Sequence, residues 1–186
     1  MNLRSELESL PPRELIEALS IQIYEPPLSN ARERLLEISE PLRVLILVLD
    51  FDTEVCMQGM LGFLENSTGL YFTETIDAFE KIDARETLEV LRGVEKTLQK
   101  HGVTPSRLRA DFAGTEEYQI TTFRELHGNL GSLPEEVEHH AKRLYLYGRE
   151  GERVWDLLEG FVKTHRQAIL DEIARVAGEA PDRGPT

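Results

Sequence analysis

Two carboxylates, Asp50 and Glu54, are spaced in a way that could support chemistry. They lie four residues apart in an otherwise apolar segment, so a helix would place both on one face. Two acids that share a face could hold a metal ion or act as an acid–base pair. Alternatively, this face meets solvent, or Glu54 accepts hydrogen bonds from a turn at residues 66–69. Because no third ligand or base is visible nearby, we predict neither a catalytic residue nor a metal site.

The histidines and the single cysteine also form no recognisable site. His139 and His140 are adjacent and would point to different faces of a helix, whereas a zinc site on a helix needs two ligands about one turn apart. Cys56 lies in the most apolar segment, where a thiol behaves as a small hydrophobe. There is neither a glycine-rich phosphate loop nor a GxSxG elbow. We therefore expect no cofactor, and a protein that is not an enzyme.

Helical periodicity dominates the elements that must position these residues. Apolar residues recur at helical spacing over residues 12–23, about 30–38, 42–57, 73–82, 85–100, 134–147 and 152–176. The segment 42–57 is apolar nearly all round, which indicates a central, buried helix. Its run at 44–49 could also be a buried strand, but the apolar pattern continues to Phe63 and favours a helix that is broken or bent near Gly59 and Gly62. The prediction is an all-α fold: a compact single-domain bundle of about seven to nine helices with an N-terminal helical appendage.

Prolines and glycines suggest how the chain is divided. The Pro26-Pro27 pair ends the first helix, so residues 1–28 are predicted to form an N-terminal helical segment and 29–177 the main helical domain. Asn66-Ser67-Thr68-Gly69 is a turn by composition, with Gly69 available for a left-handed backbone. Residues 178–186 contain little to bury and are predicted to be a frayed tail.

Charge is the most unusual bulk property. The chain has 34 Asp and Glu against 21 Lys and Arg, a net charge of −13, and residues 44–80 hold seven acids and no base. Such a field disfavours direct binding to nucleic acids and to anionic membranes and attracts basic partners. The alternative is a solvated surface that keeps the protein soluble. With no signal core, no run of roughly 20 apolar residues and no possible internal disulfide, we expect a cytoplasmic protein.

One motif resembles a bacterial protein family. Glu54-Val55 is followed by Gly59, by Phe63 and by Asn66-Ser67-Thr68-Gly69. This order resembles the core motif of the family named for the nineteen-kilodalton DNA-mimic protein. The stretches at 74–82 and 155–162 resemble the same family, whose members are helical. Where the family has two asparagines and two glycines, this chain has Cys56-Met57-Gln58-Gly59. We interpret the apolar Cys56 and Met57, in place of two amides, as a repacked core.

The resemblance implies, but does not by itself establish, a function in protein binding. The named member of the family presents carboxylates in place of DNA phosphates to a DNA-binding protein. We predict an acidic module that binds a basic or DNA-binding protein. One alternative is a ligand binder or enzyme with a cleft around Glu54 and Asn66, and another is an immunity or antitoxin protein. The candidate partner-binding residues are Glu65, Glu74, Asp77, Glu80 and Asp83. The candidate motif residues are Glu54, Gly59, Phe63, Asn66, Ser67 and Gly69.

Overall fold

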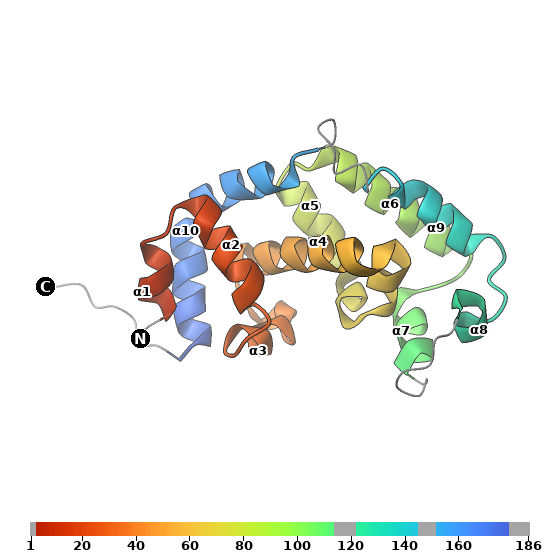
Figure 1. The fold of residues 1–186 in the computed structure, drawn as a ribbon, viewed down its shortest axis with the longest axis horizontal. Coiled ribbons are helices and arrows are strands. Elements are labelled where there is room, and N and C mark those ends of the chain that lie inside the picture. The colour runs from red at the N-terminus through yellow and green to blue at the C-terminus, as the bar shows by residue number, and fades with distance from the viewer. Residues whose placement is uncertain (1–2, 114–121, 145–151, 179–186) are drawn as a thin grey trace, which may run out of the picture. The chain divides into compact units, whose positions relative to one another are not determined.

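A computed structural model describes residues 3–113, 122–144 and 152–178. The all-α prediction is confirmed: these residues form ten α-helices and two short 3-10 helices, and no strand (Figure 1). The α-helices are α1 (Leu3–Glu8), α2 (Pro12–Gln22), α3 (Leu28–Arg32), α4 (Glu40–Glu65), α5 (Phe72–Lys81), α6 (Arg85–Lys100), α7 (Pro105–Ala113), α8 (Phe123–His127), α9 (Leu133–Ala141) and α10 (Val154–Val176). The 3-10 helices are η1 (Leu35–Glu37) and η2 (Ser67–Tyr71). The α-helices outnumber the predicted seven to nine because α1, α3 and α8 are too short for a periodic pattern to reveal them.

The contacts divide the chain into two units. The first unit contains Met1–Leu49 and Arg153–Thr186, and the second contains Asp50–Glu152. Both sides of the predicted boundary at residue 28 lie in the first unit, and the division into an N-terminal segment and a main domain stays a prediction. The predicted frayed tail lies outside the described residues except for Gly178. No helix in the described part of the chain is both long and apolar enough to cross a membrane.

In the first unit, α1 and α2 pack against the C-terminal helix α10. Leu7, Leu15 and Leu19 from the two N-terminal helices are buried, as are Ile169 and Ile173 of α10. Arg166 of α10 donates hydrogen bonds to the carbonyl oxygens of residues 7, 8 and 10, at 3.4, 2.8 and 2.6 Å. These carbonyls lie at the end of α1 and just beyond it, where backbone acceptors lack helical partners, so the guanidinium stabilises that end.

The apolar segment that begins α4 is buried, as predicted. Residues 44–51 are all buried, and this set includes the carboxylate residue Asp50, which is 1% exposed. The predicted break is also present: Gly59 has φ 74° and ψ −179°, values outside the helical region. A positive φ is rare for residues with a side chain, so the glycine allows the chain to interrupt α4 six residues before its end.

In the second unit, α6 is the central packing element. It contacts α5 on one side and α9 on another, and Val90, Leu91, Val94 and Leu98 are buried along it. Phe51, Phe63 and Phe79 form an edge-to-face group, with centroids 5.0 Å apart in the two pairs that share Phe51. These contacts join the parts of α4 on either side of Gly59 and pack Phe51 of α4 against Phe79 of α5.

The first turn of α6 is capped by a residue distant in sequence. The N-cap residue, Ala84, has no side-chain oxygen to offer. Instead, both carboxylate oxygens of Glu152 accept hydrogen bonds, from the backbone N–H groups of Glu86 at 3.0 Å and of Thr87 at 2.9 Å. A carboxylate at this position satisfies free amide groups and interacts favourably with the helix dipole.

Candidate functional site

The motif residues come together at the break in α4. The side-chain amide of Asn66 donates a hydrogen bond to Glu54 Oε2, and the amide of Gln58 donates to the same oxygen at 3.2 Å. The alternative in which Glu54 accepts hydrogen bonds from the 66–69 turn is therefore confirmed. Within the described residues, no group of three or more His, Cys, Asp or Glu side chains is arranged to hold a metal ion. Through the hydrogen bond from Asn66, Glu54 connects the turn to α4.

Gly69 allows the 66–69 turn to lie very close to the backbone of α4. Its φ is not positive, so the predicted left-handed backbone at Gly69 is wrong. A Cβ atom there would lie 2.5 Å from the carbonyl oxygen of Phe63 and 2.7 Å from that of Leu64. The missing side chain lets η2 pack directly on the last turn of α4. Phe63 lies in the core beneath, whereas Ser67 is exposed.

The departure from the family motif is on the surface. Cys56, Met57 and Gln58 are all exposed, and Met57 is 74% exposed. The interpretation of Cys56 and Met57 as repacked core is therefore wrong. The core face of this turn is supplied by Val55 and Met60, and the residues between them point away from it. Because the segment is mostly apolar, its composition does not show which side of α4 is exposed.

The five candidate partner-binding carboxylates have different surroundings. Glu65 is half-buried and its Oε1 lies 2.7 Å from Nε2 of His127, so it does not face solvent as a free acid. Glu74 is half-buried, and Asp77 is exposed. Glu80 pairs with Arg92 at 3.4 Å. The Arg85 guanidinium, 2.9 Å away, holds the pKa of Asp83 below its usual range.

Exposed acids continue beyond the predicted set into α6. Asp77, Glu80, Asp83, Glu86 and Glu89 follow one another in three-residue steps and are all exposed; we call these five the acidic run. Arg143 also approaches it, pairing with Glu89 at 3.1 Å. Glu86 and Glu89 were missed, although the same three-residue spacing in the sequence would have extended the prediction to them.

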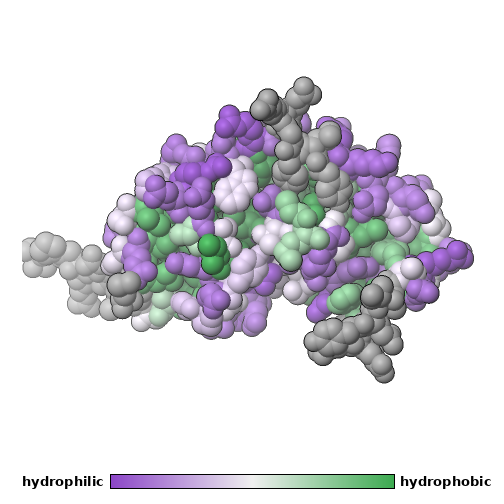
Figure 2. Space-filling model, in the orientation of Figure 1, coloured by the Kyte–Doolittle hydropathy of each residue, from purple (hydrophilic) through white to green (hydrophobic). Residues whose placement is uncertain are grey.

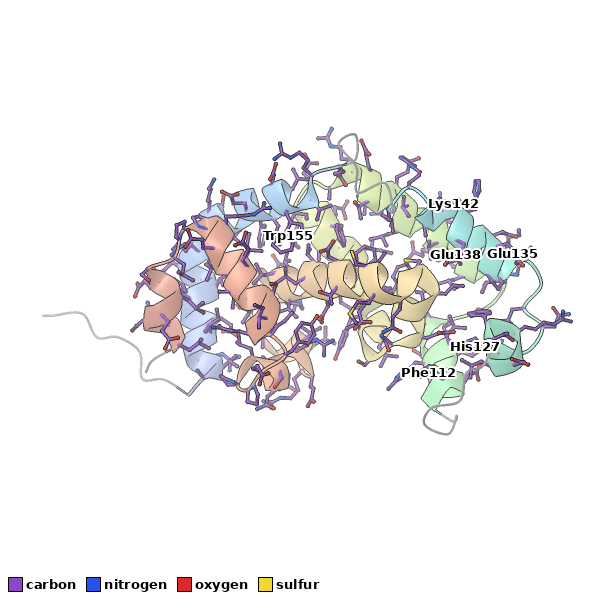
Figure 3. All side chains as sticks on the ribbon, in the orientation of Figure 1. Phe112, His127, Glu135, Glu138, Lys142 and Trp155 are labelled. Atoms are coloured by element: carbon purple, nitrogen blue, oxygen red, sulfur yellow. The ribbon has the colours of Figure 1, made fainter. Side chains whose placement is uncertain are left out.

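A second set of carboxylates lies on α9. Figure 3 shows Glu135 and Glu138 along this helix, with Lys142 at its end. Their neighbour Glu136 accepts hydrogen bonds from Lys100 Nζ at 2.8 Å and from the Ser132 hydroxyl at 2.7 Å. These contacts lower the pKa of Glu136 to about 2. Glu136 therefore stays ionised and ties α6 to α9, while hydrophilic side chains cover much of the visible face of both helices (Figure 2).

The balance of charge differs between the two units. Residues 50–152 hold 20 acids and 11 bases, a net charge of −9 of the chain's −13. The acidic run and the α9 carboxylates both belong to this unit. The helical fold and this surface define an all-α protein with a strongly negative second unit.

A family model described as DMP19-like protein matches residues 36–165. The chain belongs to this family, the DNA mimic protein 19 family, as its motif indicated. The matched residues include all of α4 through α9. Neither a curated protein nor a solved structure matches the chain.

Proposed function

We propose that the protein acts by binding a basic, DNA-binding protein, with its carboxylates taking the place of DNA phosphates. Membership of the DNA mimic protein 19 family carries the proposal. It is supported by the net charge of −9 in residues 50–152. Phosphate contacts dominate the affinity of DNA-binding proteins, so a surface that offers anions at similar spacing can compete for the same basic residues.

The acidic run is the best candidate for this surface. Within a helix, three residues advance the chain by about 4.5 Å, while successive phosphates of one DNA strand advance by about 3.4 Å along the duplex axis. Asp77 and Glu80 on α5, and Glu86 and Glu89 on α6, therefore advance along each helix by a step comparable to that between phosphates. Flexible Glu side chains can adjust to the remaining difference.

Two further expectations belong to the proposal. The protein would act without catalysis, because Glu54, the acid of the motif, is engaged by Asn66 and Gln58. It would work in the cytoplasm, where a DNA-binding partner is found. The identity of the partner separates this proposal from the immunity or antitoxin alternative, which requires a toxin in place of a DNA-binding protein.

The test is a pull-down from native lysate with the intact chain as bait. We expect a DNA-binding protein to be retained at low salt, released at high salt and displaced by duplex DNA, because all three follow from competition for basic residues. Retention of no basic protein at low salt, or retention that duplex DNA leaves unchanged, would contradict the proposal.

A matched pair of variants then locates the surface. Asp77→Lys with Glu86→Lys changes the charge of the acidic run, and Glu14→Lys with Glu25→Lys makes the same total change at exposed positions of the first unit. We expect the first pair to weaken partner binding by about tenfold or more and the second by about twofold or less. If both pairs weakened partner binding equally, only the net charge of the protein would matter for binding. The acidic run would then not be the binding site.

A further inference from the structure

The imidazole of His127 is buried between two carboxylates. Its side chain is 0% exposed, its Nε2 lies 2.7 Å from Glu65 Oε1, and its Nδ1 lies 3.0 Å from Asp111 Oδ2. Figure 3 shows His127 between α7 and α8. The three residues come from the end of α4, from α7 and from α8, so one ring joins three helices of the second unit.

The geometry specifies how many protons the cluster holds. An ionised carboxylate can only accept hydrogen bonds, and a neutral imidazole has a single N–H to donate. With a neutral ring, one carboxylate oxygen would therefore face a nitrogen lone pair at hydrogen-bonding distance, which is repulsive. Both contacts are favourable when both ring nitrogens carry a proton. Each is then a charge-assisted hydrogen bond, the stronger kind.

The attachment of α8 depends on this ring. The helix has five residues, and His127 is its one buried residue. A helix this short is not stable by itself in water. Its capping box, in which the side chain of Thr122 and that of Glu125 each bond the backbone of the other residue, closes the N-terminal end locally. Among the described residues, the hydrogen bonds of the imidazole link α8 to α4 and to α7.

We propose that His127 is a proton-dependent latch that holds α8 against α4 and α7. Among the described residues, the titratable groups that face the ring are Glu65 from α4 and Asp111 from α7. On α8 itself the ring packs on Phe123, with centroids 4.4 Å apart. Loss of the second ring proton leaves one carboxylate without a donor in a site closed to water, and α8 separates. The second proton on the His127 ring therefore determines whether α8 is docked. It also adds one positive charge to the acidic second part of the chain, residues 50–152.

The first measurement is nitrogen NMR of the histidine side chains combined with amide hydrogen exchange. We expect both nitrogens of His127 to carry protons at about pH 6, and exchange in α8, normalised to intrinsic rates and to α6, to speed up about tenfold or more by about pH 9. A neutral His127 ring while α8 remains protected would overturn the proposal. So would α8 protection that stays constant across this range.

Three variants separate a latch from a purely structural contact. His127→Gln can serve only one carboxylate as donor, so α8 should exchange fast at every pH. In Glu65→Gln the amide can accept from a protonated ring or donate to a neutral one, so α8 should stay docked and lose its pH dependence. His165→Gln is the control, because His165 packs on Phe161 at the same 4.4 Å and has no carboxylate partner among the described residues. An unchanged pH dependence in Glu65→Gln, or an equal effect of His165→Gln, would refute the latch.

Discussion

Replacing Gly69 by alanine tests the packing on which the motif depends. The added Cβ would meet the carbonyl oxygens of Phe63 and Leu64 at 2.5 and 2.7 Å, distances that real Cβ contacts do not reach. Both obstacles are backbone atoms in the last turn of α4, and they cannot rotate away as the end of a side chain could. The turn or the helix end must therefore shift, and Gly69→Ala should destabilise the protein.

The expected loss of stability follows from the kind of clash that the added Cβ makes. Forcing one extra carbon into a well-packed interior costs about 1–3 kcal/mol, and each kcal/mol lowers the Tm of a domain of about 100 residues by about 4–8 °C. Gly160 in α10 provides the opposite case, because a Cβ there meets nothing within 4 Å and its helical backbone suits alanine. Gly160→Ala should stabilise by about 1 kcal/mol through helix propensity.

Urea unfolding followed by far-ultraviolet circular dichroism measures both variants against the unsubstituted chain. We expect the midpoint to fall for Gly69→Ala and to rise for Gly160→Ala, so the same chemical change moves stability in opposite directions. If Gly69→Ala is as stable as the unsubstituted chain, the close approach of η2 to α4 is not a constraint, and the account of Gly69 is refuted.

Three other expectations are measurable on the same protein. The hydrogen bonds from Lys100 and Ser132 lower the pKa of Glu136 from 4.5 to about 2, so the resulting stabilisation is complete above pH 4.5 and disappears as the pH falls towards 2. Glu136→Gln should accordingly lower the Tm at neutral pH but not near pH 2, in thermal unfolding scans across this range. Because Cys56 is exposed, a thiol reagent should modify one equivalent in the native protein as fast as after unfolding; slow native labelling would contradict the exposure. Glu152→Ala should remove the cap of α6 and cost about 0.5–2 kcal/mol in urea unfolding, and no loss would show that solvent caps α6 equally well.

Helices with a clear pattern and a clear stop could be predicted from sequence. The apolar stripe of α6 and Gly102 just beyond its end gave its bounds correctly, at 85 and 100. The burial of α4 followed from its apolar composition, and the break followed from Gly59. The expected helix around 30–38 is instead the two short elements α3 and η1. A few apolar residues at helical spacing do not distinguish one helix from two short turns.

The candidate site was accessible to sequence reasoning only where its parts are close in the chain. Glu54 and Asn66 are 12 residues apart and belong to one motif, so their contact could be suggested in advance. His127 and Glu65 are 62 residues apart, and no pattern links them. The exposure of Cys56 was missed because an apolar residue type does not reveal which side of a helix it occupies. Three-dimensional packing determines both the contact between His127 and Glu65 and the exposure of Cys56.

The distant cap on α6 also has a consequence for the order of folding. The amide groups of Glu86 and Thr87 obtain their acceptors from Glu152, 66 and 65 residues further along. During synthesis the first turn of α6 therefore lacks this cap until the ribosome has also made α7, α8, α9 and Glu152. Contacts between such distant residues form slowly because a long loop must close first. The last residue of this unit to leave the ribosome thus completes one of its earliest helices.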